Sequence, residues 1–163
     1  MSRKIAVASD IATCVGMVLF AALCIKNFVY TGKPRQDKTS IKVGDAMTLP
    51  SVDWKANRRS VVLLLQRNCG YCSKSAPFYN RLIPEAKSKN VRVIAAMPGP
   101  IADSKEYVAG LGLPMEEVLN ANFSLLKVRG TPTVAIVDDR GIVTKVWRGY
   151  LESDKEKEVL TSL

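Results

Sequence analysis

The sequence predicts an α/β domain, a central mixed β-sheet flanked by helices, preceded by one N-terminal transmembrane helix. Apolar runs of strand length, such as Ser60–Gln66 and Val91–Met97, alternate with helical stretches such as Ala76–Lys87. This alternation is typical of a sheet whose faces are covered by helices. Residues 43–163 are enough chain to bury one hydrophobic core, and no internal repeat is visible. We therefore expect one globular domain.

Each element is expected from a local pattern. Strands are predicted over Ala46–Val52, Ser60–Gln66, Val91–Met97, Val134–Asp138 and Ile142–Trp147, the last two forming a hairpin. Helices are predicted over Ala76–Lys87, reaching back toward Ser73, and over Asp103–Leu111 and Glu152–Leu163. Asp103 is expected to cap its own helix, because an aspartate side chain accepts a hydrogen bond from the free amides of a first turn.

The N-terminal segment predicts a membrane anchor over residues 1–30. Ile11–Ile25 carries no charge, and Phe28–Tyr30 extends it to about 20 residues if Lys26 places its amine at the interface, enough to cross a bilayer. Residues 31–42 read as a basic flexible tether, and residues 43–163 as the domain. A cleaved secretory signal is the alternative, since small residues occur at Ala21 and Ala22.

The distribution of charge supports contact with membrane lipid. The chain has a formal net charge of +9, and residues 1–43 hold seven of its 24 basic residues but only two of its 15 acidic residues. Basic residues that flank a membrane segment meet anionic headgroups. The domain shows no basic helix or aromatic-basic repeat, so a nucleic-acid partner is not expected.

The motif Cys69-Gly70-Tyr71-Cys72, between an apolar run and a helical stretch, predicts a redox-active dithiol. Cysteines three positions apart fall on one turn, so their sulfurs can reach disulfide distance. Cys69 at the helix N-terminus would be stabilised as the nucleophilic thiolate, and Arg67 could add to this effect. Cys72 would be the more buried, resolving thiol. Gly70 and Tyr71 would tune the redox poise and contact substrate.

The motif allows two other interpretations. Zinc normally takes four ligands, but the chain has no His, and Cys14 and Cys24 lie in the apolar N-terminal segment. A permanent structural disulfide is the other, although so small a ring gains little stability from loop closure. We expect no metal and no cofactor.

Together with a later Thr131-Pro132-Thr133 before an apolar run, this motif resembles the thioredoxin fold, and most closely the membrane-anchored, extracytoplasmic proteins of the TlpA type. Val43-Gly44-Asp45 and the segment Val137–Val143 resemble the start of that domain and its hairpin. The resemblance implies that Cys69 and Cys72 are catalytic, and that Pro132 is a cis-proline facing them. Thr131 would offer its backbone to an extended substrate.

The same resemblance implies a place in the cell and a set of partners. A single-pass protein with an extracytoplasmic domain would exchange electrons with protein thiols or disulfides and with a membrane-bound redox partner. Simple counting of the basic residues that follow the apolar run favours a cytoplasmic domain instead. We follow the resemblance, because a folded domain can be translocated despite moderate charge.

Three positions depart from relatives. Leu63 stands where many thioredoxins have a buried acid, Asn68 where many have Trp, and Ser75 where proteins of cytochrome c maturation often have Glu. The hypothesis is a membrane-tethered thiol-disulfide oxidoreductase. A redoxin-type peroxidase is an alternative, although Gln66-Arg67-Asn68 lacks the expected Thr or Ser before Cys69. A non-catalytic binding module with a static disulfide is the second alternative.

Overall fold

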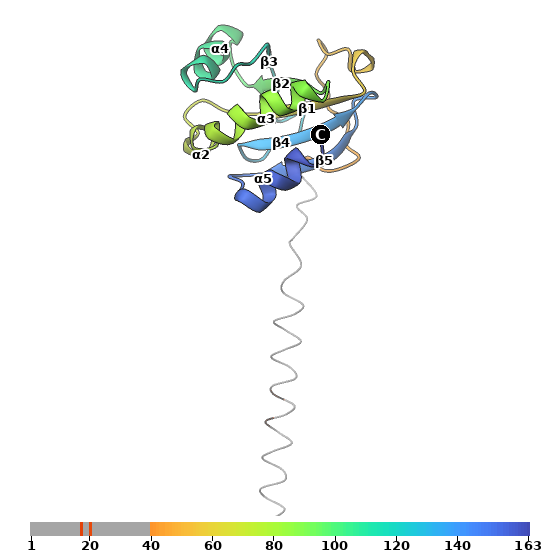
Figure 1. Cartoon of the computed structure of the whole chain (residues 1–163), viewed down its shortest axis with the longest axis vertical. Helices are drawn as coiled ribbons and strands as arrows, with labels where there is room; N and C mark the ends of the chain where they lie inside the picture. Colours follow the sequence, from red (N-terminus) through yellow and green to blue (C-terminus); the bar gives the residue numbers. More distant parts are fainter. Residues whose placement is uncertain (1–16, 18–19, 21–39) are drawn as a thin grey trace, which may run out of the picture. The chain divides into compact units, whose positions relative to one another are not determined.

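The structure is a computed structural model that describes Met17, Phe20 and residues 40–163. In chain order the elements are η1 (Trp54–Ala56), β1 (Arg59–Leu64), α2 (Gly70–Lys74), α3 (Ala76–Ser88), β2 (Arg92–Met97), α4 (Ile101–Gly110), β3 (Glu117–Asn120), β4 (Thr133–Asp138), β5 (Val143–Arg148) and α5 (Ser153–Leu160) (Figure 1). The predicted anchor and most of the tether lie outside the described residues. In the part that is described, no helix combines the length and apolarity needed to cross a membrane.

The five strands form one mixed sheet in the order β3-β2-β1-β4-β5. β1 pairs with β2 in parallel and with β4 antiparallel, and Leu63 lies opposite Ala95 on one side and Val134 on the other. β3 joins β2 in parallel, while β5 pairs antiparallel with β4. The continuous apolar run of β1 fits its central place, because both of its faces are buried. The predicted central mixed sheet is confirmed.

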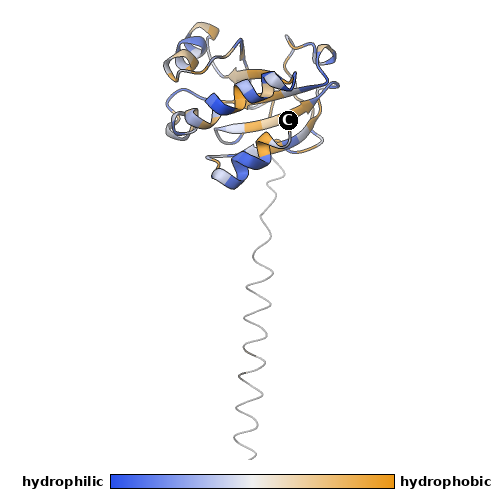
Figure 2. Cartoon of the chain, viewed as in Figure 1, coloured by the Kyte–Doolittle hydropathy of each residue, from blue (hydrophilic) through white to orange (hydrophobic). Residues whose placement is uncertain are grey.

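The two faces of the sheet are covered differently. On one face, Val61 and Leu63 of β1, together with Leu65 just after the strand, pack in a cluster with residues of α3 and with Val159 of α5. On the other face, Val62 and Leu64 pack against irregular chain around Met47 and Leu126, with no α-helix in the cluster. Apolar colour is concentrated in the strands, and polar colour on the outer surfaces of the helices (Figure 2). Helices therefore cover one face, and the expectation that they flank the sheet holds only there.

The predicted strand Ala46–Val52 is wrong. Only Ala46 makes a bridge, to Ile142, and the chain then turns, with the Leu49 N–H donating to the Met47 carbonyl. Met47 and Leu49 are buried, and the residues beside them are exposed. The alternating pattern in the sequence therefore reflects burial of these two side chains and not a β-strand. β3 was not predicted, because its sequence Glu-Val-Leu-Asn is short and mixed in polarity.

The helix expected from Ser73 onward is divided. α2 ends at Lys74 and α3 starts at Ala76, because Pro77 has no N–H to continue the ladder and suits a first turn. α4 starts at Ile101 with Pro100 as its N-cap, so the prediction that Asp103 caps it is wrong, and Asp103 lies in the first turn. The hairpin and the closing helix are confirmed, the latter as α5.

Candidate active site

The two cysteines lie where β1 ends and α2 begins. Cys69 is the N-cap of α2, and its Sγ accepts a hydrogen bond from the Cys72 N–H at 3.1 Å. The pair is joined as a disulfide, with Cα atoms 5.2 Å apart. Cys72 is fully buried, whereas Cys69 is partly exposed. Of the two cysteines, Cys69 is therefore the one that a partner molecule can approach.

The groups that could stabilise a Cys69 thiolate are local. α2 has only five residues, so its dipole is short. The donor that contacts the Cys69 sulfur directly is the Cys72 N–H. Arg67 is directed elsewhere, because its guanidinium pairs with Asp103 of α4 at 2.5 Å, and both side chains are about half exposed. The expectation that Arg67 adds to thiolate stability finds no contact to support it.

Thr131 and Pro132 lie directly against the dithiol. The peptide bond between them is cis, and the Thr131 carbonyl oxygen is 3.4 Å from Cys69 Sγ. The loop is fixed on both sides: the Gly149 N–H donates to the Pro132 carbonyl at 2.7 Å, and the Thr133 hydroxyl to the Gly130 carbonyl at 2.8 Å. Within residues 40–163 the Thr131 N–H donates no backbone hydrogen bond. The expected position of this cis-proline is confirmed.

Gly70 and Tyr71 form the outer surface of the dithiol turn. Both are exposed, and Tyr71 keeps 60% of its surface accessible. A Cβ added at Gly70 would meet no heavy atom within 4 Å, so glycine leaves open space beside Cys69. Their predicted contact with substrate is compatible with this exposure.

The structure shows what surrounds the three positions that depart from the thioredoxin pattern, Leu63, Asn68 and Ser75. Leu63 is fully buried in the same apolar cluster as Cys72. Ser75 is buried, and its hydroxyl donates to the Tyr71 carbonyl at 2.8 Å, which stabilises the dithiol turn. Asn68 adopts a left-handed conformation with φ of 60°, which asparagine tolerates well. Burial in this cluster raises the pKa of the Tyr79 phenol, so Tyr79 stays protonated and is no substitute for the missing acid.

One contact at the site was not foreseen. The sequence suggests that Lys74 is a surface charge whose stem covers apolar neighbours, but its ammonium lies 4.3 Å from the centre of the Tyr150 ring. Tyr150 follows β5, about 75 residues later in the chain. Nothing in the local sequence links the two residues, because only the pairing of β5 with β4 places them together.

A strand leading into a Cys-x-x-Cys turn, with a cis-proline loop against the outer sulfur, defines a thioredoxin-like thiol-disulfide oxidoreductase. The Redoxin family model matches residues 36–163, and the chain belongs to the Redoxin family. No curated protein matches the chain closely enough to be reported as a relative.

Solved structures show the same fold. A protein assigned as the thiol:disulfide interchange protein DsbE, from Chlorobium tepidum, is 24% identical with a TM-score of 0.59, covering 76% of this chain and 98% of that one. The exposed lipoprotein thioredoxin Etrx1 of Streptococcus pneumoniae is 24% identical with a TM-score of 0.51, covering 68% and 88%. A thiol:disulfide interchange protein from Bacteroides sp. is 20% identical with a TM-score of 0.55, covering 75% and 87%.

Proposed function

We propose that this protein is a membrane-tethered oxidoreductase that exchanges disulfides with protein thiols through Cys69 and Cys72. One observation carries the proposal. Cys69 is partly exposed, and its sulfur lies 3.4 Å from the carbonyl oxygen of Thr131, whose backbone N–H has no partner among residues 40–163. An extended polypeptide that pairs with the Thr131 backbone would bring its own sulfur to Cys69.

The reaction follows from the difference in burial between the two cysteines. In the reduced protein, the Cys69 thiolate attacks one sulfur of a substrate disulfide, and the other substrate sulfur leaves as a thiolate. Cys72 then loses its proton and attacks Cys69, which forms the Cys69–Cys72 disulfide and releases the second substrate thiol. Two electrons pass from the protein to the substrate. The same steps in reverse oxidise a substrate dithiol.

Cysteine variants test this order of steps. Cys72→Ser should accumulate a mixed disulfide between Cys69 and a protein substrate, because the resolving thiol is absent. Cys69→Ser should neither trap substrate nor exchange, although Cys72 keeps its thiol. Both variants are compared by non-reducing electrophoresis and mass spectrometry. Equal trapping by the two variants, or exchange by Cys69→Ser, would refute the assignment of Cys69 as the nucleophile.

The family also makes peroxide reduction a candidate reaction. There the Cys69 thiolate would attack a peroxide oxygen, release water or an alcohol, and form a sulfenic acid that condenses with Cys72. Gln66 and Asn68, which precede Cys69, are exposed and make no side-chain hydrogen bond to it among residues 40–163. We therefore favour disulfide exchange. Peroxide consumption by the reduced protein as fast as its exchange with protein disulfides would reverse this preference.

The direction of electron flow is decided by the reduction potential. A value near about −270 mV for the Cys69–Cys72 pair, measured against glutathione buffers, would support a reductase supplied by a membrane electron carrier. A value of about −120 to −180 mV would support an oxidase or isomerase. A disulfide that does not equilibrate at all would instead support the binding module with a static disulfide.

The membrane tether is proposed from the sequence of residues 1–42. The uncharged run Ile11–Ile25 and the basic residues around it support insertion as a single-pass anchor in contact with anionic lipid. We place the domain outside the cytoplasm, where a membrane-bound redox partner would exchange electrons with it. In spheroplasts of a bacterial expression host, a membrane-impermeant maleimide should label reduced Cys69. Labelling only after lysis would place the domain in the cytoplasm.

A further inference from the structure

We propose that Lys74 and Tyr150 form a recognition surface beside the dithiol that favours substrates with an acidic residue two positions from the reacting cysteine. This inference rests on the proposed function and names the substrate class of that same site.

The loop that carries Tyr150 borders the substrate loop. Thr133 and Arg148 are partners in the pairing of β4 with β5, so the chain leaves β5 next to the cis-proline. The next residue, Gly149, donates its N–H to the Pro132 carbonyl at 2.7 Å. Tyr150 therefore directly follows a residue, Gly149, that contacts the loop facing Cys69.

Lys74 reaches the same place from the dithiol helix. It is the last residue of α2, two positions after Cys72, and its ammonium lies 4.3 Å from the centre of the Tyr150 ring. The negative face of the ring attracts the ammonium and limits where the long side chain can go. Lys74 is exposed and Tyr150 keeps 40% of its surface accessible, so both remain open to a partner.

The positive charge of Lys74 is left without a counter-charge. Among residues 40–163 no carboxylate forms an ion pair with it, and Glu152, which follows Tyr150 by two residues, is no exception. An aromatic ring stabilises a cation but does not neutralise it. Arg67, which precedes Cys69 by two residues, is compensated by Asp103 at 2.5 Å. Lys74 therefore contributes a fixed, accessible positive charge beside the site.

The geometry of an extended substrate selects the position that meets this charge. On a strand, residues two apart point to the same face and lie about 6 to 7 Å apart along the chain. When the substrate cysteine faces Cys69, the residues two positions away also face the protein surface. The contact with Tyr150 holds the Lys74 ammonium beside the chain that leaves β5, where Gly149 touches the cis-proline loop. An acidic side chain at such a substrate position can pair with the ammonium, whereas a basic one is repelled.

The test uses the reduced full-length chain in mild detergent and three disulfide-linked peptides. They differ only in having Glu, Gln or Lys two positions from the cysteine, on both sides. Single-turnover rate constants are measured by acid quench and thiol alkylation. At low ionic strength we expect the Glu peptide to react about two- to fivefold faster than the Gln peptide, and the Lys peptide more slowly than both. The preference should shrink at about 0.5 M salt, because salt screens exposed charges.

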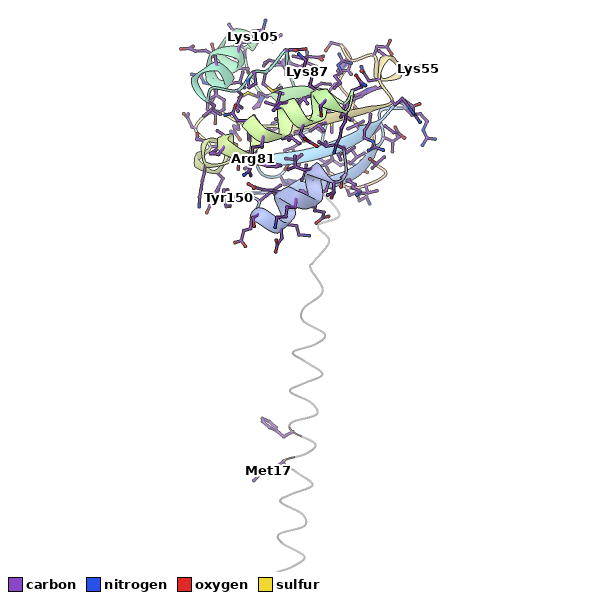
Figure 3. All side chains as sticks on the ribbon, in the orientation of Figure 1. Met17, Lys55, Arg81, Lys87, Lys105 and Tyr150 are labelled. Atoms are coloured by element: carbon purple, nitrogen blue, oxygen red, sulfur yellow. A yellow bond between two sulfur atoms is a disulfide. The ribbon has the colours of Figure 1, made fainter. Side chains whose placement is uncertain are left out.

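Four variants identify the source of the preference. Lys74→Gln should bring the ratio of Glu to Lys rates close to one. Tyr150→Leu should lower the ratio by freeing the ammonium, while Tyr150→Phe keeps the ring and should preserve it. Lys105→Gln removes an exposed lysine of α4 that lies on the opposite side of the domain from Tyr150 (Figure 3), and should leave the ratio unchanged.

The ratio of the Glu-peptide rate to the Lys-peptide rate separates substrate recognition from the reactivity of Cys69. A change in the pKa of Cys69 would alter the rates of all three peptides together and leave the ratio intact. Equal rates for all three peptides, or equal losses of ratio in Lys74→Gln and Lys105→Gln, would overturn this inference and leave the proposed exchange standing. Failure of the wild-type protein to exchange with any of the peptides would overturn the proposed function, and this inference with it.

Discussion

Gly141 in the turn between β4 and β5 offers a sharp test of how the N-terminal part of the domain is held on the sheet. Its φ is +79°, a conformation that residues with a Cβ adopt only at a cost. A Cβ at this position would lie 2.8 Å from Cδ1 and 2.9 Å from Nε1 of the Trp54 indole. Gly141→Ala is therefore expected to destabilise the domain in two ways, through the backbone and through displacement of Trp54.

The two contributions can be estimated separately. A left-handed conformation costs a residue with a Cβ about 1–2 kcal/mol relative to glycine. Forcing an added methyl against a packed side chain costs about 1–3 kcal/mol more. Gly141→Ala should thus lower the free energy of unfolding by about 2–5 kcal/mol. With Trp54→Leu as the background, the indole contact is gone, and the same substitution should cost about 1–2 kcal/mol.

Urea unfolding of the wild type, both single variants and the double variant, followed by circular dichroism, measures this difference. A cost that is the same in both backgrounds to within about 0.5 kcal/mol would show that contact with Trp54 is not the cause. A cost below about 1 kcal/mol in the wild-type background would refute the backbone argument as well.

Three further predictions concern single side chains. Because Asn68 has a φ of 60°, Asn68→Ala should lower the free energy of unfolding by about 1 kcal/mol, while Asn68→Gly should not lower it. Equal losses of unfolding free energy in the two variants, measured by urea titration, would contradict this. Hydrogen bonds from the Ile142 N–H and from Arg140 lower the pKa of Asp138, so its contribution to stability is present above the pKa of the unfolded chain and is lost as pH falls through the folded value. Unfolding midpoints of Asp138→Asn between about pH 5 and pH 2 should therefore fall less steeply than those of the wild type. Burial raises the pKa of Tyr79, so the stability of the fold should decline as pH rises above the ordinary tyrosine pKa of about 10. Spectrophotometric titration should show one fewer slowly ionising phenol in Tyr79→Phe than in the wild type. A Tyr79 that ionises together with the exposed tyrosines would refute the assignment.

The dithiol could be located from sequence because its signal is local. Cys69 and Cys72 are three positions apart, and the apolar run before them is buried on both faces as a central strand must be. The same holds for the hairpin of β4 and β5, whose turn residues follow directly on a strand pattern. The position of Pro132 against the cysteines came from resemblance to a family, since no local pattern shows which residues 60 positions apart will meet.

Two errors in the predicted elements arise from backbone hydrogen bonding that the residue pattern does not show. Met47 and Leu49 alternate with exposed residues as a strand would and are buried against the sheet, but only Ala46 forms a bridge, because burial by itself does not extend a ladder. Pro77 divides the predicted helix after Cys72, since a missing N–H interrupts the ladder however suitable the neighbouring residues are.

The sequence by itself located the dithiol and predicted the α/β class of this protein, because both depend on residue types at short spacings. Only the tertiary structure decided which charges surround the dithiol. It directs Arg67 to Asp103 and brings Lys74 to Tyr150 across about 75 residues of chain. The direction of a long charged side chain depends on partners supplied by other elements, and these become neighbours only when the sheet is assembled.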